Sequence, residues 1–306
     1  MRVILRFFYI YKIYNFLNIK LSMLLFYNFN SFTYNLFNKL YKLLICSKYQ
    51  ITGLNQFTQK GYQKLKTIDL NKINIINNEL LKSNSKKNIE GQVKFEITPE
   101  ITRIVNKIFS EDLKELTAKL ETYYNAKIIL SGIMITRNHS VSTDAETFSN
   151  YLHNDSYLFT CNQIFINLMD VGYENGPLHY LEFDQQKKFL KKINFFSTIK
   201  RYFYKNYFHQ NEIKHNVGKI GDALLVNTSE LIHAAGTPKD AKYRDILFLE
   251  IAAIPNCQKM QNKMKINRNY SYNESILTKV IAKPENIKTL IKYFFYYYFS
   301  KKNFNI

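Results

Sequence analysis

The stretch that decides the fold is Lys127–Arg137, with the sequence KIILSGIMITR. Its aliphatic and β-branched residues, uninterrupted by proline, favour an extended strand. From this point strands dominate the sequence to about Ala253. The central part of the chain is therefore expected to be built mainly from β-structure.

The segment before this stretch has the pattern of a helix. Ser110–Asp112 offers a hydroxyl cap and carboxylates for a first turn. Leu113, Leu116, Leu120 and Tyr124 then recur along one face, so we expect the helix to end near Tyr124. Helices followed by a run of strands predict a mainly β fold with flanking helices. The architecture expected is a double-stranded β-helix of the jelly-roll or cupin-like kind.

Length and composition suit one central domain with an extension at each end. The chain has 306 residues, of which 46% are hydrophobic, enough for a sizeable core. We place the domain at residues 55–255, between a basic aromatic N-terminal helical extension (1–54) and a basic aromatic C-terminal extension (256–306). Residues 185–217 form a lid-like insertion. The polar run Ser83–Asn88 is expected to be an exposed loop.

Charge and cysteine content say little about partners. A net charge of +19 would suit a nucleic-acid ligand. However, Lys, Asn, Ile, Tyr and Phe share A/T-rich codons, so codon bias alone explains the excess, and no nucleic-acid-binding motif accompanies it. We expect a small-molecule substrate instead. Cys46, Cys161 and Cys257 are widely spaced, which gives neither a disulfide framework nor a zinc pattern and suits a reducing, cytoplasmic location.

Both terminal extensions are basic and aromatic, and two interpretations of them stay open. Residues 1–50 contain no acidic residue, and Tyr293–Phe299 reads YFFYYYF between lysines. The extensions could lie on an anionic membrane or pack on the core. The uncharged run Leu21–Asn38 approaches the roughly 20 residues of a membrane span but is interrupted by asparagines. We expect partial packing with weak, salt-sensitive peripheral membrane association.

His153-Asn154-Asp155 and the distant His233 have the composition of a metal site. In an extended chain residues i and i+2 project to the same side, so His153 and Asp155 can reach one metal ion. Two imidazoles and one carboxylate can occupy one face of an octahedral Fe(II) and leave the opposite positions open. An open face is what oxygen activation requires.

The third ligand and a possible anion-binding residue come from the next two strands. Gly221–Asn227 is a turn followed by an apolar strand that would deliver His233. Arg244 follows the turn-like Gly236–Asp240 and precedes the strand Ile246–Ile251. A hairpin would return Arg244 to the side of the metal, where its guanidinium can bind a carboxylate in bidentate fashion.

On these residues the sequence resembles the phytanoyl-CoA dioxygenase family of Fe(II)/2-oxoglutarate-dependent oxygenases. The resemblance covers roughly residues 55 to 255. It rests on the candidate metal-binding residues and on the Gly-Asp before the second-histidine strand. Three further segments are similar to the family: Phe57–Tyr62 to its domain start, Gln163–Asp170 to its central strand and Glu174–Leu178 to its Asn-Gly-Pro-Leu turn.

The resemblance implies an enzyme that hydroxylates a C–H bond while 2-oxoglutarate is decarboxylated to succinate. His153, Asp155 and His233 would hold iron, Arg244 would pair with the distal carboxylate of 2-oxoglutarate, and ascorbate would serve as a reductant. Because related halogenases replace the carboxylate ligand with a small residue, Asp155 argues against halogenation. The expected substrate is a small or lipid-like metabolite.

Two departures from the family pattern concern the substrate and the co-substrate. His179–Asp184 replaces the family's Pro-Gly-Ser-His segment, which leaves the substrate open. Ala235 stands where some members have a serine, so co-substrate binding rests more on Arg244. The insertion 185–217 alternates lysines with aromatic residues and is either a lid for an acidic or phosphate-bearing substrate or a solvated helix.

Three other classes of function stay open from the sequence. A zinc-dependent hydrolase could use the same ligands with a water in the fourth position. A non-catalytic membrane-associated protein with a vestigial metal site would explain the aromatic ends. An oxygenase acting on nucleic acid would use the positive charge. The intact ligand set together with Arg244 favours the 2-oxoglutarate-dependent oxygenase.

Overall fold

The computed structural model describes residues 53–83, 86–89, 91–124, 126–141, 150, 152–153, 155, 161–186 and 213–255. The predicted terminal extensions lie almost wholly outside these residues, as does most of the insertion 185–217. The membrane and lid predictions therefore stay predictions. In the part of the chain that the structure describes, every helix falls short of the length and apolar character needed to cross a bilayer.

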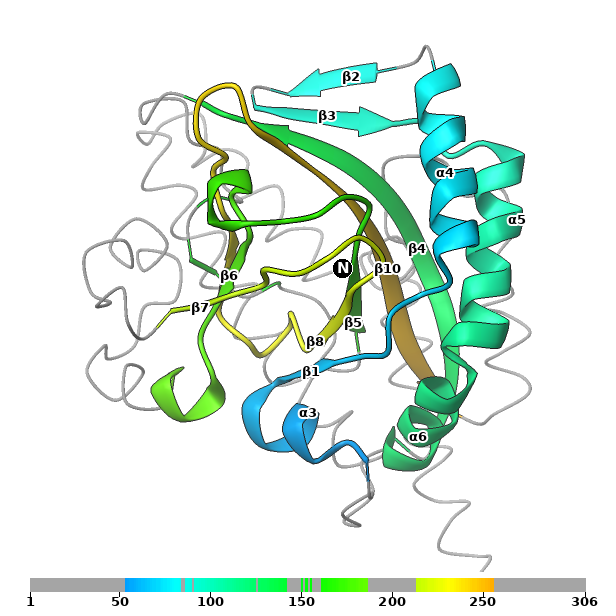
Figure 1. Ribbon diagram of the computed structural model, residues 1–306. Coiled ribbons are helices and arrows are strands. Elements are labelled where there is room, and N and C mark those ends of the chain that lie inside the picture. The colour runs from blue at the N-terminus through cyan, green and yellow to red at the C-terminus, as the bar shows by residue number, and fades with distance from the viewer. Residues whose placement is uncertain are drawn as a thin grey trace, which may run out of the picture.

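Two antiparallel sheets make up the β-structure of the described residues. The large sheet has seven strands in the order β1-β8-β5-β10-β4-β3-β2, and the small sheet has three in the order β7-β6-β9. The strands of both sheets are β1 (Tyr62–Lys64), β2 (Lys86–Ile89), β3 (Gln92–Phe95), β4 (Ala126–His139), β5 (Cys161–Asn167), β6 (Leu178–Tyr180), β7 (Lys214–His215), β8 (Ala223–Val226), β9 (His233–Ala235) and β10 (Tyr243–Pro255). Two such sheets with helices at one side confirm the predicted jelly-roll class (Figure 1).

The long strands β4 and β10 form the centre of the large sheet. They pair from Tyr243↔His139 to Pro255↔Ala126, and a β-bulge follows Glu250. On β10, Leu247 and Leu249 face the helices, so Ile246 and Phe248 face the opposite way. The stretch Lys127–Arg137 therefore forms the predicted strand, and its neighbour β10 has one face in each of two cores.

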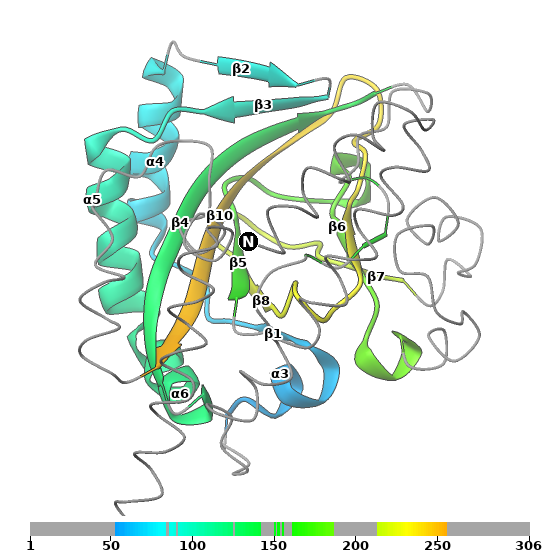
Figure 2. The same ribbon diagram turned by 180° about the vertical axis from the view of Figure 1, so that it is seen from behind.

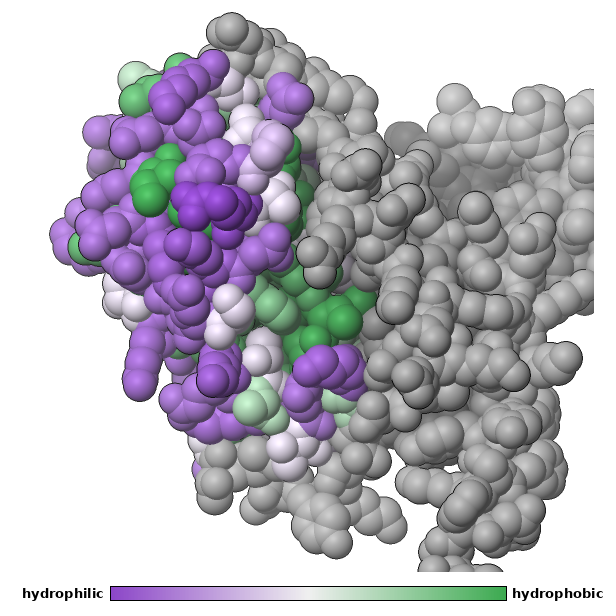
Figure 3. All heavy atoms as spheres, turned by 90° about the vertical axis from the view of Figure 1, so that its right-hand side faces the viewer, coloured by the Kyte–Doolittle hydropathy of each residue, from purple (hydrophilic) through white to green (hydrophobic). Residues whose placement is uncertain are grey.

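A helical layer covers one face of the large sheet, and Figures 1 and 2 show it on the side away from the small sheet. Its members are α4 (Leu70–Lys82), α5 (Pro99–Lys107), the π-helix η1 (Ile108–Asp112) and α6 (Lys114–Tyr124). The short helix α3 (Asn55–Lys60) lies beside β1 instead (Figure 1). On α4 the buried residues Ile73, Ile76 and Leu80 contact the sheet core. The outer surface of the layer is mostly hydrophilic (Figure 3).

The helix start predicted at Ser110 is wrong. The helical segment begins earlier, at Pro99, where the Thr98 side chain accepts a hydrogen bond from the Ile101 amide. Ser110 instead donates to the Lys107 carbonyl oxygen within a helical run that continues through η1. Leu116, Leu120 and Tyr124 are buried on α6, so the predicted apolar face and helix end hold.

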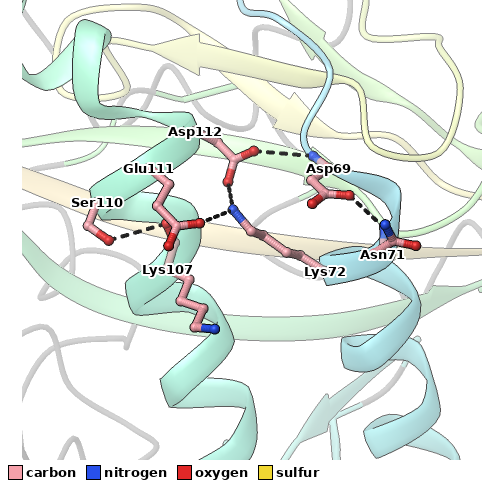
Figure 4. A network of polar contacts seen from close by, with 7 residues as sticks. All are labelled: Asp69, Asn71, Lys72, Lys107, Ser110, Glu111 and Asp112. Atoms are coloured by element: carbon pink, nitrogen blue, oxygen red, sulfur yellow. Dashed lines mark hydrogen bonds and ion pairs between the residues drawn. The ribbon is translucent and has the colours of Figure 1, made fainter.

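The carboxylates that resembled a first turn have another role. Glu111 and Asp112 lie 2.6 and 2.5 Å from the Lys72 ammonium nitrogen on α4 (Figure 4). Asp112 also accepts a hydrogen bond from the backbone amide of Asp69, at the start of α4. These contacts fasten the beginning of α4 to η1, which a reading of local helix signals does not reveal.

The loop predicted at Ser83–Asn88 is also wrong in part. Lys86–Ile89 forms the edge strand β2, which pairs with β3. Gly91 lies between them with φ 71°, a left-handed conformation that favours glycine. The polar composition of this segment predicted a loop, whereas pairing with β3 decides its conformation.

The space between the two sheets is filled by a second core. Its buried members are Tyr62, Phe165, Leu178, Tyr180, Leu224, Val226, Leu231 and Ile246, from both sheets. Tyr62 and Tyr180 pack with ring centroids 4.6 Å apart. This inner core fixes the small sheet opposite β5, β8 and β10, and the predicted site residues lie around it.

Candidate metal centre

His153 and His233 are joined through their backbones. The amide of each donates to the carbonyl oxygen of the other, at 2.8 and 2.7 Å, although His153 lies outside the named strands. Residues paired in this way present their side chains on the same face. The two imidazole rings are accordingly adjacent, with centroids 4.6 Å apart.

Asp155 completes the group. Its amide donates to the carbonyl oxygen of Thr228, in the turn between β8 and β9. Its carboxylate oxygens lie 3.6 Å from His153 Nε2 and 3.7 Å from His233 Nε2. The spacing His153-Asn154-Asp155 thus brings both side chains to one point, and the strand after Gly221 leads the chain to His233.

The three ligand atoms fit a metal ion. All of them lie within 4.8 Å of one another. Ligands at right angles on an ion with bonds of roughly 2.1 Å would be about 3 Å apart, so small side-chain shifts would close the site. Neutral imidazole nitrogens with a carboxylate suit Fe(II), Ni(II) or Zn(II) better than the oxygen-preferring Mg(II) or Ca(II).

One hydrogen bond orients the imidazole of His233. His233 Nδ1 lies 2.9 Å from the Leu231 carbonyl oxygen. Because a carbonyl oxygen only accepts, Nδ1 carries a hydrogen, and in the neutral imidazole Nε2 then keeps its lone pair for a metal. Burial opposes the charged form of Asp155, but His233 and His153 outweigh it and hold the pKa of the carboxyl below its usual value.

Arg244 faces the same interior as His153, Asp155 and His233. It lies two residues from Ile246 on β10 and shares the inner face of that strand. Ile246 packs in one cluster with Tyr180, which is the cross-strand partner of His233 on the small sheet. Arg244 and His233 therefore point into the space between the two sheets from opposite sides.

The guanidinium of Arg244 is buried without a counter-charge among the described residues. The residue is 2% exposed, and burial lowers its pKa to about 10. Nη1 donates to the Gly176 carbonyl oxygen, while Nε has no hydrogen-bond partner in the described part of the chain. A buried cation with an unused donor is costly unless an anion binds it. A ligand carboxylate would meet that need.

The hairpin predicted between His233 and Arg244 is wrong. β9 pairs with β6 in the small sheet, whereas β10 pairs with β4 and β5 in the large sheet. The segment Gly236–Asp240 crosses from one sheet to the other, and at its start the Gly236 amide continues the pairing with the β6 side by donating to the Pro177 carbonyl oxygen. Arg244 reaches the interior across the two sheets.

Gln163 contacts the site although the sequence assigned it no separate role, whereas the role of His179 was left open because it begins the segment that departs from the family pattern. Gln163 on β5 donates to Asp155 Oδ2 at 3.4 Å, and it occupies an inward position of the predicted central strand. His179 and His215 are cross-strand partners with rings 4.6 Å apart. Burial, His215 and Arg244 together lower the pKa of His179 to about 4, so its imidazole is neutral near pH 7.

No protein-family model matches the chain, and no curated protein matches it significantly. Similar solved structures include the non-heme, α-ketoglutarate-dependent epimerase SnoN from nogalamycin biosynthesis, with 12% identity, TM-score 0.48 and coverage of 65% of this chain and 80% of that one.

HygX from Streptomyces hygroscopicus, solved with nickel and 2-oxoglutarate, has 15% identity and TM-score 0.48, covering 68% and 88% of the two chains. The non-heme monooxygenase ThoJ, solved with nickel, has 10% identity and TM-score 0.41, covering 66% and 78%. At such identities and TM-scores, the likeness does not extend to the activity of this chain.

Proposed function

We propose that this chain is an Fe(II)- and 2-oxoglutarate-dependent oxygenase that hydroxylates a C–H bond of a small or lipid-like metabolite. The observation that carries the proposal is the placement of His153, Asp155 and His233 on one side of an interior that also holds the buried Arg244. Three ligands of this kind leave an octahedral ion half open, which suits a chelating co-substrate and dioxygen.

Each residue has a separate task in this proposal. The two imidazoles and Asp155 bind iron, and the Leu231 carbonyl keeps the Nε2 lone pair of His233 directed at it. Arg244 binds the distal carboxylate of 2-oxoglutarate and so orients its 2-oxo acid end toward the metal. The bound iron supplies the oxidising chemistry. The apolar inner core around Phe165, Leu178 and Ile246 excludes water from the guanidinium and strengthens the ion pair.

Succinate release tests this function. The wild-type protein with iron and ascorbate is incubated with 2-oxoglutarate and a panel of metabolites, including acidic and acyl-thioester compounds. We expect succinate to form under oxygen, most rapidly with the true substrate, and to be lost in Asp155→Ala. A protein that consumes no 2-oxoglutarate but hydrolyses esters or amides with zinc would contradict the proposal.

The zinc hydrolase is the alternative that shares the ligand set. The two functions differ in their need for Arg244, because a hydrolase of this kind requires only three protein ligands and a metal-bound water. It would leave without a purpose the buried charge of Arg244, which has no counter-charge among the residues that the structure describes. That residue is the reason for preferring an enzyme with an anionic co-substrate.

A further inference from the structure

Two turns pack against each other beside Arg244, namely Glu174–Leu178 and Gly236–Asp240. The Gly236 amide donates to the Pro177 carbonyl oxygen at 3.1 Å, and the Lys239 amide donates to that of Glu174 at 2.9 Å. A Cβ atom at position 176 would lie 2.4 Å from the Pro238 nitrogen, and one at position 236 would lie 2.3 Å from the Pro177 oxygen. The two backbones are therefore in direct contact.

Asn175 ties this contact to the start of β10. Its side-chain oxygen accepts a hydrogen bond from the Gly172 amide at 2.9 Å, which holds the turn closed. Its side-chain nitrogen donates to the carbonyl oxygen of Tyr243 at 2.9 Å. Tyr243 immediately precedes Arg244, so the amide of Asn175 fixes the backbone from which the guanidinium extends.

Gly176 contacts the tip of the Arg244 side chain. Its carbonyl oxygen accepts the hydrogen bond from Arg244 Nη1. Gly176 has φ 62°, a left-handed conformation that glycine adopts without strain. The turn thus contacts Arg244 both at the backbone before it and at the tip of its side chain, while Nε stays without a partner among the described residues.

We propose that the Asn175-Gly176 turn is a positioning device for Arg244, which presents the free edge of the guanidinium to the distal carboxylate of the co-substrate. The proposal rests on the function proposed above. A bidentate contact requires a defined orientation of the guanidinium plane. Because the turn orders Arg244 before the ligand arrives, binding does not have to immobilise it.

Calorimetric titration of the Mn(II)-loaded protein tests this role without relying on turnover. The probes are 2-oxoglutarate and 2-oxobutyrate, a 2-oxo acid without the distal carboxylate. Asn175→Ala removes both hydrogen bonds, whereas Asn175→Asp keeps the acceptor for Gly172 but cannot donate to Tyr243. In both variants we expect the Kd for 2-oxoglutarate to rise roughly tenfold. The Kd for 2-oxobutyrate and the affinity for Mn(II) should not change.

A double-mutant cycle with Arg244→Lys shows whether Asn175 acts through Arg244. The combined variant should bind 2-oxoglutarate little worse than Arg244→Lys alone, because residues acting through one contact are not additive. Thr98→Ala controls for a general loss of stability, because it removes the N-cap of α5, a helix that is distant in sequence from the Asn175-Gly176 turn. This variant should leave both Kd values unchanged.

The possible outcomes separate the two proposals. Equal weakening of both ligands in Asn175→Ala, or additive effects with Arg244→Lys, would overturn the positioning role alone. Equal Kd values for both 2-oxo acids in the wild-type protein, together with an unchanged Kd for 2-oxoglutarate in Arg244→Lys, would overturn the assignment of Arg244. The proposed function would fall with it.

Discussion

At the level of single residues, the candidate metal site depends on one nitrogen atom in each of two imidazoles and on one carboxylate. The backbone pairing of His153 with His233 brings the rings together, and the Thr228 carbonyl positions Asp155. Removing a side chain from this group leaves those backbone hydrogen bonds in place. Metal binding and folding can therefore be separated by mutation.

His233→Ala is expected to abolish stoichiometric Fe(II) binding while the protein stays folded, since one of three ligands is lost. His215→Ala is the matched control, because it removes an imidazole from β7 of the same small sheet that is not part of the triad. Metal content after gel filtration and circular dichroism would check both variants. Retention of one tightly bound iron by His233→Ala would refute the ligand assignment.

Arg244→Lys keeps the positive charge but loses the planar fork. We expect the affinity for 2-oxoglutarate to fall by about tenfold or more, equivalent to roughly 1.4 kcal/mol. Arg137→Lys is the control, because Arg137 lies on the neighbouring strand, pairs with Asp245 at 2.6 Å and faces the helical layer. Comparable losses in both variants would show that Arg244 has no specific part in binding.

At the level of elements, the helical layer stabilises the sheet that bears Arg244. Leu80 and Leu81 are neighbours on α4, with 7% and 84% exposure. Leu80→Ala should lower the free energy of unfolding by about 2 kcal/mol or more through the cavity it leaves. Leu81→Ala should change it by no more than about 0.5 kcal/mol. Denaturant titration measures both, and equal effects would contradict the described packing.

The elements also show how far the sequence alone leads. The strands β4, β8 and β10 and the apolar face of α6 were predictable, because their patterns are local. The helix α4 was missed, although Ile73, Ile76 and Leu80 recur at helical spacing and Asp69 caps its first turn. The signal was present but diluted by asparagines and lysines.

Other differences have no local signal. Lys86–Ile89 becomes a strand only because β3 lies beside it. Thr98 caps the start of α5, but the carboxylates of Glu111 and Asp112 gave a stronger local signal and led to a predicted helix start at Ser110. In the structure these two carboxylates pair with Lys72 instead. Likewise, the two-residue spacing predicted that His153 and Asp155 meet, whereas no local pattern indicates that Gly236–Asp240 crosses from the small sheet to the large one.

At the level of the whole molecule, the sequence of the terminal extensions, which lie outside the described residues, predicts weak, salt-sensitive membrane association. Full-length protein should sediment weakly with anionic liposomes at low salt and be released at high salt. Each basic residue near the surface contributes about 1 kcal/mol, which salt screens. A variant limited to residues 53–255 should lose this binding. Absence of sedimentation at low salt, with a large fall in Tm on truncation, would favour packing on the core.

The most direct test of the account is whether the metal site and Arg244 form one binding site. Under anaerobic conditions, 2-oxoglutarate is titrated into the wild-type protein with and without Fe(II). We predict that one equivalent of bound iron strengthens 2-oxoglutarate binding at least tenfold, and that His233→Ala and Arg244→Lys each weaken the ternary complex. Binding of 2-oxoglutarate that is independent of iron, or its absence from the iron-loaded protein, would contradict the account.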